Sequence, residues 1–165
     1  MTVSVHAYAR AHTATFVADK MRNLLKVLIR HHGLDPQKLV DAWSSWVDVA
    51  ARAWMEDGDL DAVIIEFYRP GDTHASARWD FPIRYDGTDI DQMWVDRDFF
   101  QDSFAKAAPP PGNCTYRVLL LPSATAKTLP GISSVSFLSL NGMVAREAGT
   151  VIATPDIMAS MKYYR

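Results

Sequence analysis

The chain has a single cysteine, no long apolar run and no recognisable export signal. Cys114 stands alone among 165 residues, so no disulfide can form within the chain, and this is compatible with a reducing compartment. No apolar stretch is long enough to cross a membrane, and residues 1–5 lack the basic-then-apolar layout of a signal peptide. We therefore expect a cytoplasmic protein with no membrane partner.

Basic charge and catalytic motifs are also scarce. The formal net charge is −2, and the seventeen lysines and arginines are scattered without forming a basic patch. The sequence contains no glycine-rich phosphate loop, no nucleophile elbow and no paired-cysteine motif. It therefore predicts no direct binding of nucleic acid, no cofactor, no metal and no catalytic residue.

Three weaker patterns each have a chemical and a structural interpretation. The His31-His32 pair lacks a metal-ligand partner at helical spacing, which favours a solvated helix end. Asp86, Asp89 and Asp91 cluster after a strand, but they lack the ligand pattern of a calcium loop, which favours a polar loop. Cys114 begins an apolar strand and is expected to be inert and partly buried, not half of a dyad with a histidine.

The composition that is present suits one globular domain. Hydrophobic residues make up 48% of the chain and charged residues 22%, which is far from a disordered composition. A chain of this length can bury a core that needs neither disulfides nor metal. We predict a single domain over residues 1–165.

Two amphipathic helices are predicted before residue 58. Apolar residues recur at steps of three and four, which is typical of one buried helical stripe: Phe16, Val17, Met21, Leu24, Leu25, Leu28 and Ile29. Gly33 suits a helix end, and Asp35-Pro36 suits the start of the next helix. The second stripe contains Leu39, Val40, Trp43, Val47, Ala50 and Trp54. The short connection predicts an antiparallel helix pair.

The hydrophobic period then changes to two, which indicates strands. Residues 62–68 and 77–85 predict a hairpin around a turn at 69–72, and residues 116–121 predict a third strand after a helix at about 96–107. A central place for 62–68, antiparallel to both neighbours, satisfies the hairpin and the crossover together. Pro82 cannot donate to a ladder, so the 77–85 strand is expected near an edge. Val3, Val5 and Ala7 give a weak further strand signal.

The last 43 residues have no helical period. From Ser123 to Arg165, short apolar pieces alternate with Gly, Pro, Asn and Ser. This tail contains apolar residues that can be buried, such as Val151, Ile152 and Ile157. We therefore expect it to lie across the core as a clasp and to cover an open sheet edge. A clasp suggests binding and not catalysis.

The aromatic residues are interpreted as core, with one exception. Trp43, Trp54, Phe99, Phe100 and Phe104 fall on the apolar faces of the predicted helices. Trp46 lies off the stripe of its helix, so two interpretations stay open: packing against the third helix, or a surface contact.

Motifs along nearly the whole chain resemble the bacterial HORMA proteins. They are His12-x-x-x-x-Val17 with Asp19, Gly33-Leu34-Asp35-Pro36, Trp43, Gly58-Asp59-Leu60, Val63-Ile64-x-Glu66-x-Tyr68, Arg78-Trp79-Asp80, Asn141-Gly142-Met143-Val144, Gly149-Thr150-Val151 and Tyr163-Tyr164-Arg165. Pro82 and the stretch 124–136 depart from this likeness.

The resemblance implies an α+β fold, with three helices packed on a central antiparallel sheet. It also implies a core at residues 1–122 and a mobile C-terminal safety belt at 123–165, which wraps a short peptide called the closure motif. In CBASS anti-phage operons, HORMA proteins of this kind in the closed state bind and activate a CD-NTase that makes a cyclic oligonucleotide, and an AAA+ ATPase reopens them by pulling on the N-terminus. The protein would then be a sensor and adaptor and not an enzyme, and a second HORMA protein is a further candidate partner.

Candidate site residues follow from both lines of reasoning. The apolar edge that would receive the peptide comprises Tyr116, Arg117, Val118, Leu119, Leu120 and Leu121. The belt signature comprises Asn141, Gly142, Met143, Val144, Gly149, Thr150, Val151, Ile152, Tyr163 and Tyr164, and we expect residues 142–165 to pair with the 77–85 strand in the closed state. The remodeller-engaged N-terminus comprises Thr2, Val3, Ser4, Val5 and His6.

Two other descriptions of the molecule remain open at this stage. One is a small α/β enzyme with an acidic site in the loop around residues 86–91. The other is a constitutive structural subunit whose tail never moves.

Overall fold

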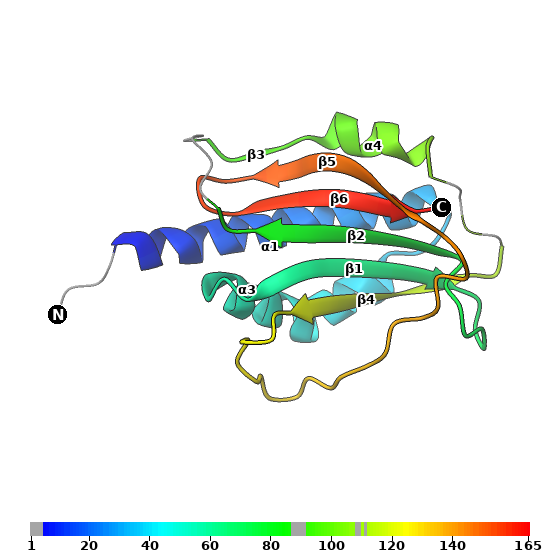
Figure 1. The fold of residues 1–165 in the computed structure, drawn as a ribbon, viewed down its shortest axis with the longest axis horizontal. Coiled ribbons are helices and arrows are strands. Elements are labelled where there is room, and N and C mark those ends of the chain that lie inside the picture. The colour runs from blue at the N-terminus through cyan, green and yellow to red at the C-terminus, as the bar shows by residue number, and fades with distance from the viewer. Residues whose placement is uncertain (1–4, 87–91, 108–109, 111) are drawn as a thin grey trace.

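A six-stranded sheet forms the centre of the computed structural model, which describes residues 5–86, 92–107, 110 and 112–165 (Figure 1). All neighbouring strands are antiparallel, in the spatial order β3-β5-β6-β2-β1-β4. The strands are β1 (Leu60–Tyr68), β2 (Ala77–Arg84), β3 (Trp94–Val95), β4 (Thr115–Pro122), β5 (Ala145–Ala153) and β6 (Met158–Tyr164). The predicted central place of β1 between β2 and β4 is confirmed.

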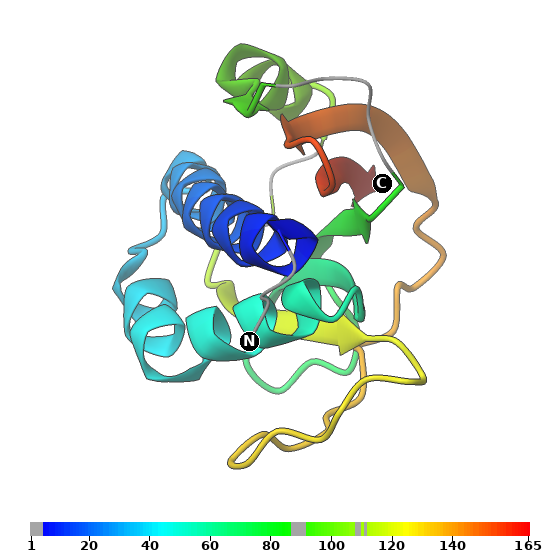
Figure 2. The ribbon, with the colours of Figure 1, turned by 90° about the vertical axis from the view of Figure 1, so that its left-hand side faces the viewer.

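The helices form three units, as the sequence predicts. The first is α1 (Val5–His31), and the second is a continuous run of α2 (Gln37–Ala42), a π-helical turn η1 (Trp43–Val47) and α3 (Asp48–Glu56). The third is α4 (Arg97–Phe104), where the Asp96 side chain accepts a hydrogen bond from the Phe99 N–H at 3.0 Å and caps the helix. Figure 2 shows α1 and α3 on one side of the sheet and the orange segment of the chain before β5 on the other.

The N-terminal strand signal is wrong from residue 5 onward. The alternation of Val5 and Ala7 with polar residues is too short to oppose the helical stripe that follows, and α1 extends back to Val5. The backbone of its first turns projects beyond the sheet (Figure 1). Val3 and the other residues before Val5 lie outside the described residues.

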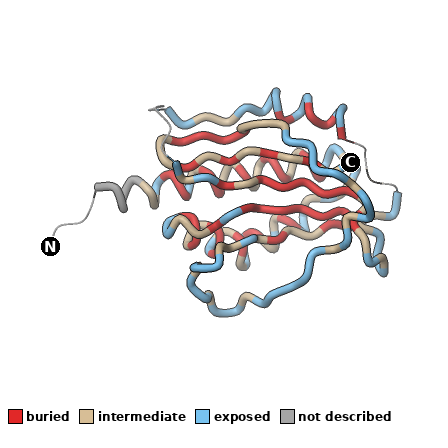
Figure 3. Tube along the Cα trace, viewed as in Figure 1, coloured by how far each residue is buried: buried red, intermediate tan, exposed pale blue. Residues whose placement is uncertain are grey.

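The main core lies between the helices and the sheet. Buried residues run along α1, α3, β1 and β2 and continue into β5 and β6, so the tail contributes to the core (Figure 3). Val151, Ile152 and Ile157 are fully buried, which confirms the expectation that the tail is folded. Phe100 and Phe104 are buried as predicted, but Phe99 is 37% exposed and its ring lies over Gly149.

Strand β6 covers the β2 edge, as expected for the closed state. Its register places Trp79 opposite Tyr163 and Arg84 opposite Met158, but the ladder skips Phe81 and Pro82. The Phe67 carbonyl accepts from the Ser76 N–H at 2.7 Å, so Phe67 directs its main-chain groups toward β2. By alternation and register, Pro82 directs its nitrogen toward β6, which explains the gap.

Candidate functional site

A groove of about 630 Å³ lies along the free edge of β4. From Ser123 the chain turns back and runs beside β4, and it then crosses the sheet to reach β5 (Figure 1). We call residues 123–144 the belt loop and residues 145–165 the belt hairpin. The belt loop supplies one wall of the groove, β4 the second, and Trp46 and Trp54 from the helices the third.

The main-chain groups of β4 alternate between β1 and the groove. The main-chain groups of Phe67 face β2, so those of the alternate residues along β1 face β4. These alternate residues are Glu66, Ile64 and Ala62, which pair with Arg117, Leu119 and Leu121. Tyr116, Val118 and Leu120 therefore direct their N–H and C=O groups to the free edge. A hydrogen bond from Lys38 Nζ to the Tyr116 carbonyl, at 2.8 Å, agrees with this assignment.

The six residues predicted to bind peptide differ in whether they line the groove. The Tyr116 side chain is buried, and its hydroxyl donates to the Asp35 carbonyl at 2.7 Å and accepts from the Leu39 N–H at 3.2 Å. Burial raises the pKa of Tyr116, and the ring fastens β4 to α2 without lining the groove. Residues 117–121 do line the groove.

Sequence reasoning missed the helical wall of the groove. Trp46 is half-buried, packs against the main core and also lines the groove, so it takes part in both core packing and the groove surface. It sits in the π-helical turn, where the Asp48 N–H bonds to the Trp43 carbonyl, and such turns are rare and are frequent at functional sites. Trp54 is buried, and its indole Nε1 donates to the Lys127 carbonyl at 2.9 Å, so it also holds the belt loop.

The belt loop is fastened by polar contacts at both ends. At its start, Asp59 accepts from the hydroxyls of Ser123 at 2.7 Å and Thr125 at 2.9 Å. At its far end, Ser139 exchanges main-chain hydrogen bonds with the β1–β2 connection: its N–H donates to Thr73 and its carbonyl accepts from Ala75. The loop residues that line the groove, which the sequence did not single out, include Leu129, Ile132, Val135 and Phe137; their apolar character in a polar stretch is the signal that could have found them.

The buried carboxylate of Glu66 holds the belt loop where it crosses the sheet. Glu66 is 0% exposed on β1; it accepts from Arg117 Nε at 2.7 Å and from the Leu138 N–H at 2.9 Å. Arg117 also donates from Nη2 to the Ser136 carbonyl at 2.7 Å. Two core strands are thereby bonded to two points of the belt loop.

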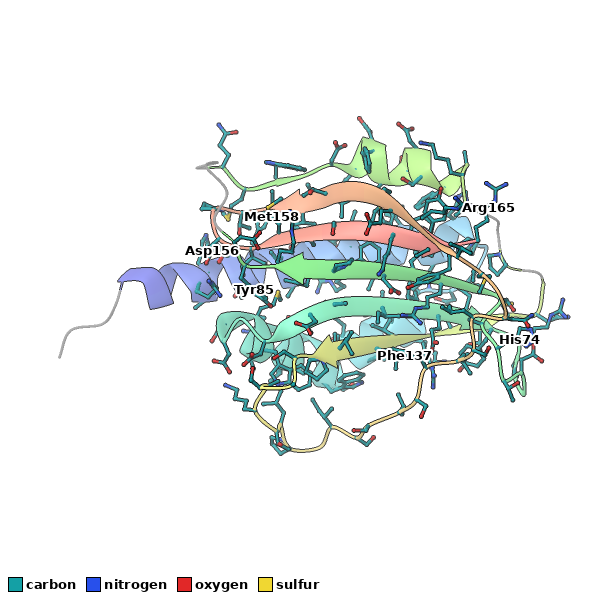
Figure 4. All side chains as sticks on the ribbon, in the orientation of Figure 1. His74, Tyr85, Phe137, Asp156, Met158 and Arg165 are labelled. Atoms are coloured by element: carbon teal, nitrogen blue, oxygen red, sulfur yellow. The ribbon has the colours of Figure 1, made fainter. Side chains whose placement is uncertain are left out.

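A second arginine, Arg78, contacts both the belt loop and the belt hairpin. Arg78 on β2 donates to both carboxylate oxygens of Asp80, at 2.8 and 3.0 Å. Its guanidinium lies 4.7 Å from the ring centre of Phe137 and 4.8 Å from that of Tyr164, whose hydroxyl donates to Asp80. Burial would lower the pKa of Arg78, but its hydrogen bonds with Asp80 and the carboxylate charge raise it. Figure 4 shows Phe137 on the belt segment that crosses toward β5.

The predicted belt signature residues shape the turn and the hairpin and do not line the groove. Asn141 and Gly142 both have positive φ, and the Met143 N–H bonds to the Leu140 carbonyl at 3.0 Å, which is the Asn-Gly turn that lets the chain enter β5. Val144 exchanges main-chain hydrogen bonds with Arg165, at 3.0 and 3.1 Å. Gly149 has φ +140, and a Cβ there would lie 3.3 Å from the Phe99 ring. Thr150, Val151 and Ile152 lie in β5, and Tyr163 and Tyr164 lie in β6.

An ion pair joins helix α1 to the tip of the belt hairpin. Arg10 Nε donates to an Asp156 carboxylate oxygen at 2.6 Å, and both side chains are mostly buried. The Arg10 guanidinium lies 5.2 Å from the ring centre of Tyr85, at the end of the sheet where Figure 4 labels Tyr85, Asp156 and Met158. Of the five residues predicted to engage a remodeller, Val5 and His6 begin α1, and Thr2, Val3 and Ser4 lie outside the described residues.

The weaker chemical patterns have these outcomes. His31 stacks on Phe104 at 4.4 Å, and His32 meets Phe67 edge-on at 4.6 Å, with both ring nitrogens buried and without a hydrogen bond. The expectation of a solvated pair is therefore wrong for His32, because the helix end packs under β1; burial, then the charge of His31, lowers its pKa to about 4. Cys114 is half-buried, as predicted. Asp89 and Asp91 lie outside the described residues.

Within the described ranges, no group of three or more His, Cys, Asp or Glu residues could hold a metal ion. None of the helices in the described part of the chain combines the length and apolar character that a membrane span requires.

Comparison with solved structures shows the fold. The protein is similar to a chain of the mitotic checkpoint complex, with 11% identity, a TM-score of 0.70 and coverage of 92% of this chain and 97% of that one. It is similar to a chain of the E. coli MS115-1 HORMA:CdnC:Trip13 complex, with 15% identity, a TM-score of 0.64 and coverage of 100% and 95%. It is also similar to C. elegans HTP-1 bound to the HIM-3 closure motif, with 15% identity, a TM-score of 0.51 and coverage of 73% and 69%.

Comparison with family models identifies the family. No curated protein matches the sequence. The model of the family described as bacterial HORMA domain 2 matches residues 1–165, which is the whole chain. The predicted fold is confirmed: three helices on a central antiparallel sheet. The chain belongs to the bacterial HORMA domain 2 family.

Proposed function

We propose that the protein captures a closure-motif peptide as an added strand beside β4, under the belt loop. The observation that carries this is the free β4 edge: Val118 and Leu120 present main-chain donors and acceptors to an apolar groove that the belt loop encloses. An extended peptide that adds to a sheet edge gains affinity from main-chain hydrogen bonds and specificity from pockets for alternate side chains. The structure of C. elegans HTP-1 bound to the HIM-3 closure motif supports the same use of the fold.

We further propose that the closed, peptide-bound protein is a sensor and adaptor in anti-phage defence, without catalytic activity of its own. It would bind and activate a CD-NTase in the cytoplasm, because only a partner that prefers the closed state can be regulated by closure. The E. coli complex that contains HORMA, CdnC and Trip13 chains supports this set of partners.

An AAA+ ATPase would reopen the protein from its N-terminus. The Arg10–Asp156 pair supports this part of the proposal, because unwinding the first turns of α1 would remove the charge that holds the belt hairpin tip. Deleting residues 2–6 should leave peptide binding intact and abolish ATP-dependent release. Release at the normal rate from the truncated protein would place the handle elsewhere.

The peptide-binding test uses the alternation along β4. Val118→Pro removes an N–H that faces the groove, and proline is tolerated on a strand edge whose N–H faces solvent. Leu119→Pro instead removes an N–H that faces β1, and it should destabilise the fold. We expect peptides to co-purify with the wild type, detected by mass spectrometry, and to be lost from folded V118P. Peptide binding that V118P retains would contradict capture at this edge.

The adaptor test is an omission experiment. The protein, its co-purified peptide and the cognate CD-NTase are mixed, and cyclic-oligonucleotide synthesis is measured with each component left out. We expect synthesis only with all three. Synthesis that does not depend on this protein would refute the adaptor role, and nucleotide or ester hydrolysis by the protein alone, lost on changing Asp89 or Asp91 to Ala, would favour an enzyme.

A further inference from the structure

The free edge of β4 is occupied at one end by a lysine. Lys38 Nζ donates to the Tyr116 carbonyl at 2.8 Å and lies 3.4 Å from the Thr115 hydroxyl. Paired strands lie about 4.8 Å apart, and their hydrogen bonds fill the space between them. The Lys38 ammonium therefore takes the place that a peptide N–H would need at Tyr116, and strand pairing must stop there.

The other end of the edge lacks a donor. Pro122 has no N–H, and the next N–H, of Ser123, is already bonded to the Asp59 carbonyl at 2.7 Å. Between these two ends, only Val118 and Leu120 offer both an N–H and a C=O to the groove. An added strand that uses these two residues needs about five residues, since pairing residues alternate with residues that face away.

The groove also selects against charge. Two cationic residues line it, and both have anionic partners: Arg117 bonds Glu66, and Lys127 lies 3.1 Å from Asp57. The rest of the lining is apolar or small and polar, with Trp46 and Trp54 on the helical side. A charged side chain placed against this lining would lose hydration without gaining a partner, which is unfavourable.

We propose that the groove accepts a short, uncharged, extended segment of about five residues, and that Lys38 and Pro122 set its length. This rests on the proposed capture of a peptide at β4. Lys38 is then a specificity-determining residue. It forms no pocket for a peptide side chain, but it prevents strand pairing from extending to Tyr116. The segment pairs through Val118 and Leu120, and at least one of its alternate side chains is large and apolar against the two tryptophans.

The test selects peptides from a random display library against the wild-type protein and then trims the selected sequences from each end. We expect affinity to stay within about threefold until about five residues remain, and then to fall about tenfold with the next removal, as a hydrogen-bonded pair is lost. In residue-resolved hydrogen exchange, the selected peptide should protect the amides of Val118 and Leu120 and leave that of Leu119 unchanged, because Leu119 already bonds β1.

The variant that tests the lysine is Lys38→Met, which keeps the stem and removes the ammonium. Its exposed position makes it safe for folding, and Lys26→Met on α1 is the matched control. We expect the minimal peptide to lengthen by about two residues in K38M, since the next outward-facing residue becomes available, and to stay unchanged in K26M.

Three results would overturn the inference. They are an equal minimal length in K38M and the wild type, a wild-type affinity that keeps rising well beyond five residues, or charged side chains enriched inside the pairing segment. In each of these the capture of peptides at β4 still stands. If no library peptide binds the wild type at all, the proposed function fails and this inference fails with it.

Discussion

The two halves of the belt differ in what holds them. The belt hairpin contains all of the tail's fully buried residues, from Val151 onward, and forms two strands of the sheet. The belt loop contains no buried residue between 123 and 144, forms none of the named strands and is attached through polar contacts and through the partly buried apolar side chains of Ala126, Leu129 and Ile132. One part of the tail therefore belongs to the folding unit, and the other part lies outside the sheet and the buried core.

The difference teaches that removing the whole tail is a poor test of the clasp. Truncation after Pro122 would remove Val151, Ile157 and Met161 from the main core, so loss of binding could reflect unfolding. Point changes within each half separate the two roles, and the following predictions use them.

The largest effect is expected in the hairpin. Ile157→Ala removes a fully buried side chain and should lower the free energy of unfolding by about 2–5 kcal/mol. Leu129→Ala in the belt loop removes a half-buried one and should cost less than about 1 kcal/mol, while it weakens peptide binding. Urea unfolding and a binding titration measure both. Equal losses of stability would erase the distinction between the two halves.

A smaller effect is expected at Glu66. Glu66→Gln replaces a carboxylate that accepts from Arg117 and from Leu138, and hydrogen bonds to charged groups contribute about 1.5–3 kcal/mol. Hydrogen exchange at the Leu138 amide should accelerate because the belt loop detaches there. The control is Asp48→Asn, which breaks a half-buried i,i+4 pair with Arg52 on the same helix and should cost under about 0.5 kcal/mol. Unchanged exchange at Leu138 in E66Q would show that the loop is held elsewhere.

Trp54→Phe should act mainly on the belt loop. The ring that fills the core is largely kept, but the indole donor to the Lys127 carbonyl is lost, at a cost of about 1 kcal/mol. We expect a captured peptide to dissociate faster, since the loop must open before release. Surface plasmon resonance with a selected peptide measures the rate, and a dissociation rate equal to that of the wild type would contradict this role of the indole.

The smallest effect concerns pH and should be confined to the folding unit. The pKa of His32 is lowered to about 4, so the unfolded chain binds the proton more readily between pH 6.5 and 4. The contribution of the neutral His32 side chain to the free energy of unfolding is complete above pH 6.5 and is lost as pH falls through 4. Urea midpoints should fall from pH 7 to pH 4.5, and less steeply in His32→Phe. A pH slope unchanged in H32F would assign the dependence to other groups.

Periodicity predicted most of the fold because burial of one face dictates it. The stripe of Met21, Leu24 and Leu28 and the alternation of Trp79 and Phe81 left few other arrangements. The small strand β3, which pairs Trp94 and Val95 with β5, was missed because two residues carry no period. The division of the tail into β5 and β6 was also missed, and only the pairing of the tail with β2 was predicted.

The site was predicted less completely, for a different reason. The apolar β4 edge is visible in the sequence, but its helical wall depends on the π-helical turn that places Trp46, and periodicity assumes a regular helix. Glu66 bonds Arg117 and Leu138, from which it is separated by 51 and 72 positions in the chain. Only the assembled sheet brings these residues together.

Pro82 divides the contact between β2 and the belt hairpin into two short ladders. Its ring faces β6, so the seam between β2 and the belt hairpin lacks hydrogen bonds at its centre, and pairing is confined to Trp79–Asp80 and Ile83–Arg84. Each of these two short stretches of β-ladder can break independently of the other. Separation of the hairpin from β2 therefore breaks a shorter ladder than separation of β1 from β4, whose pairing runs from Ala62 to Tyr68 without a gap.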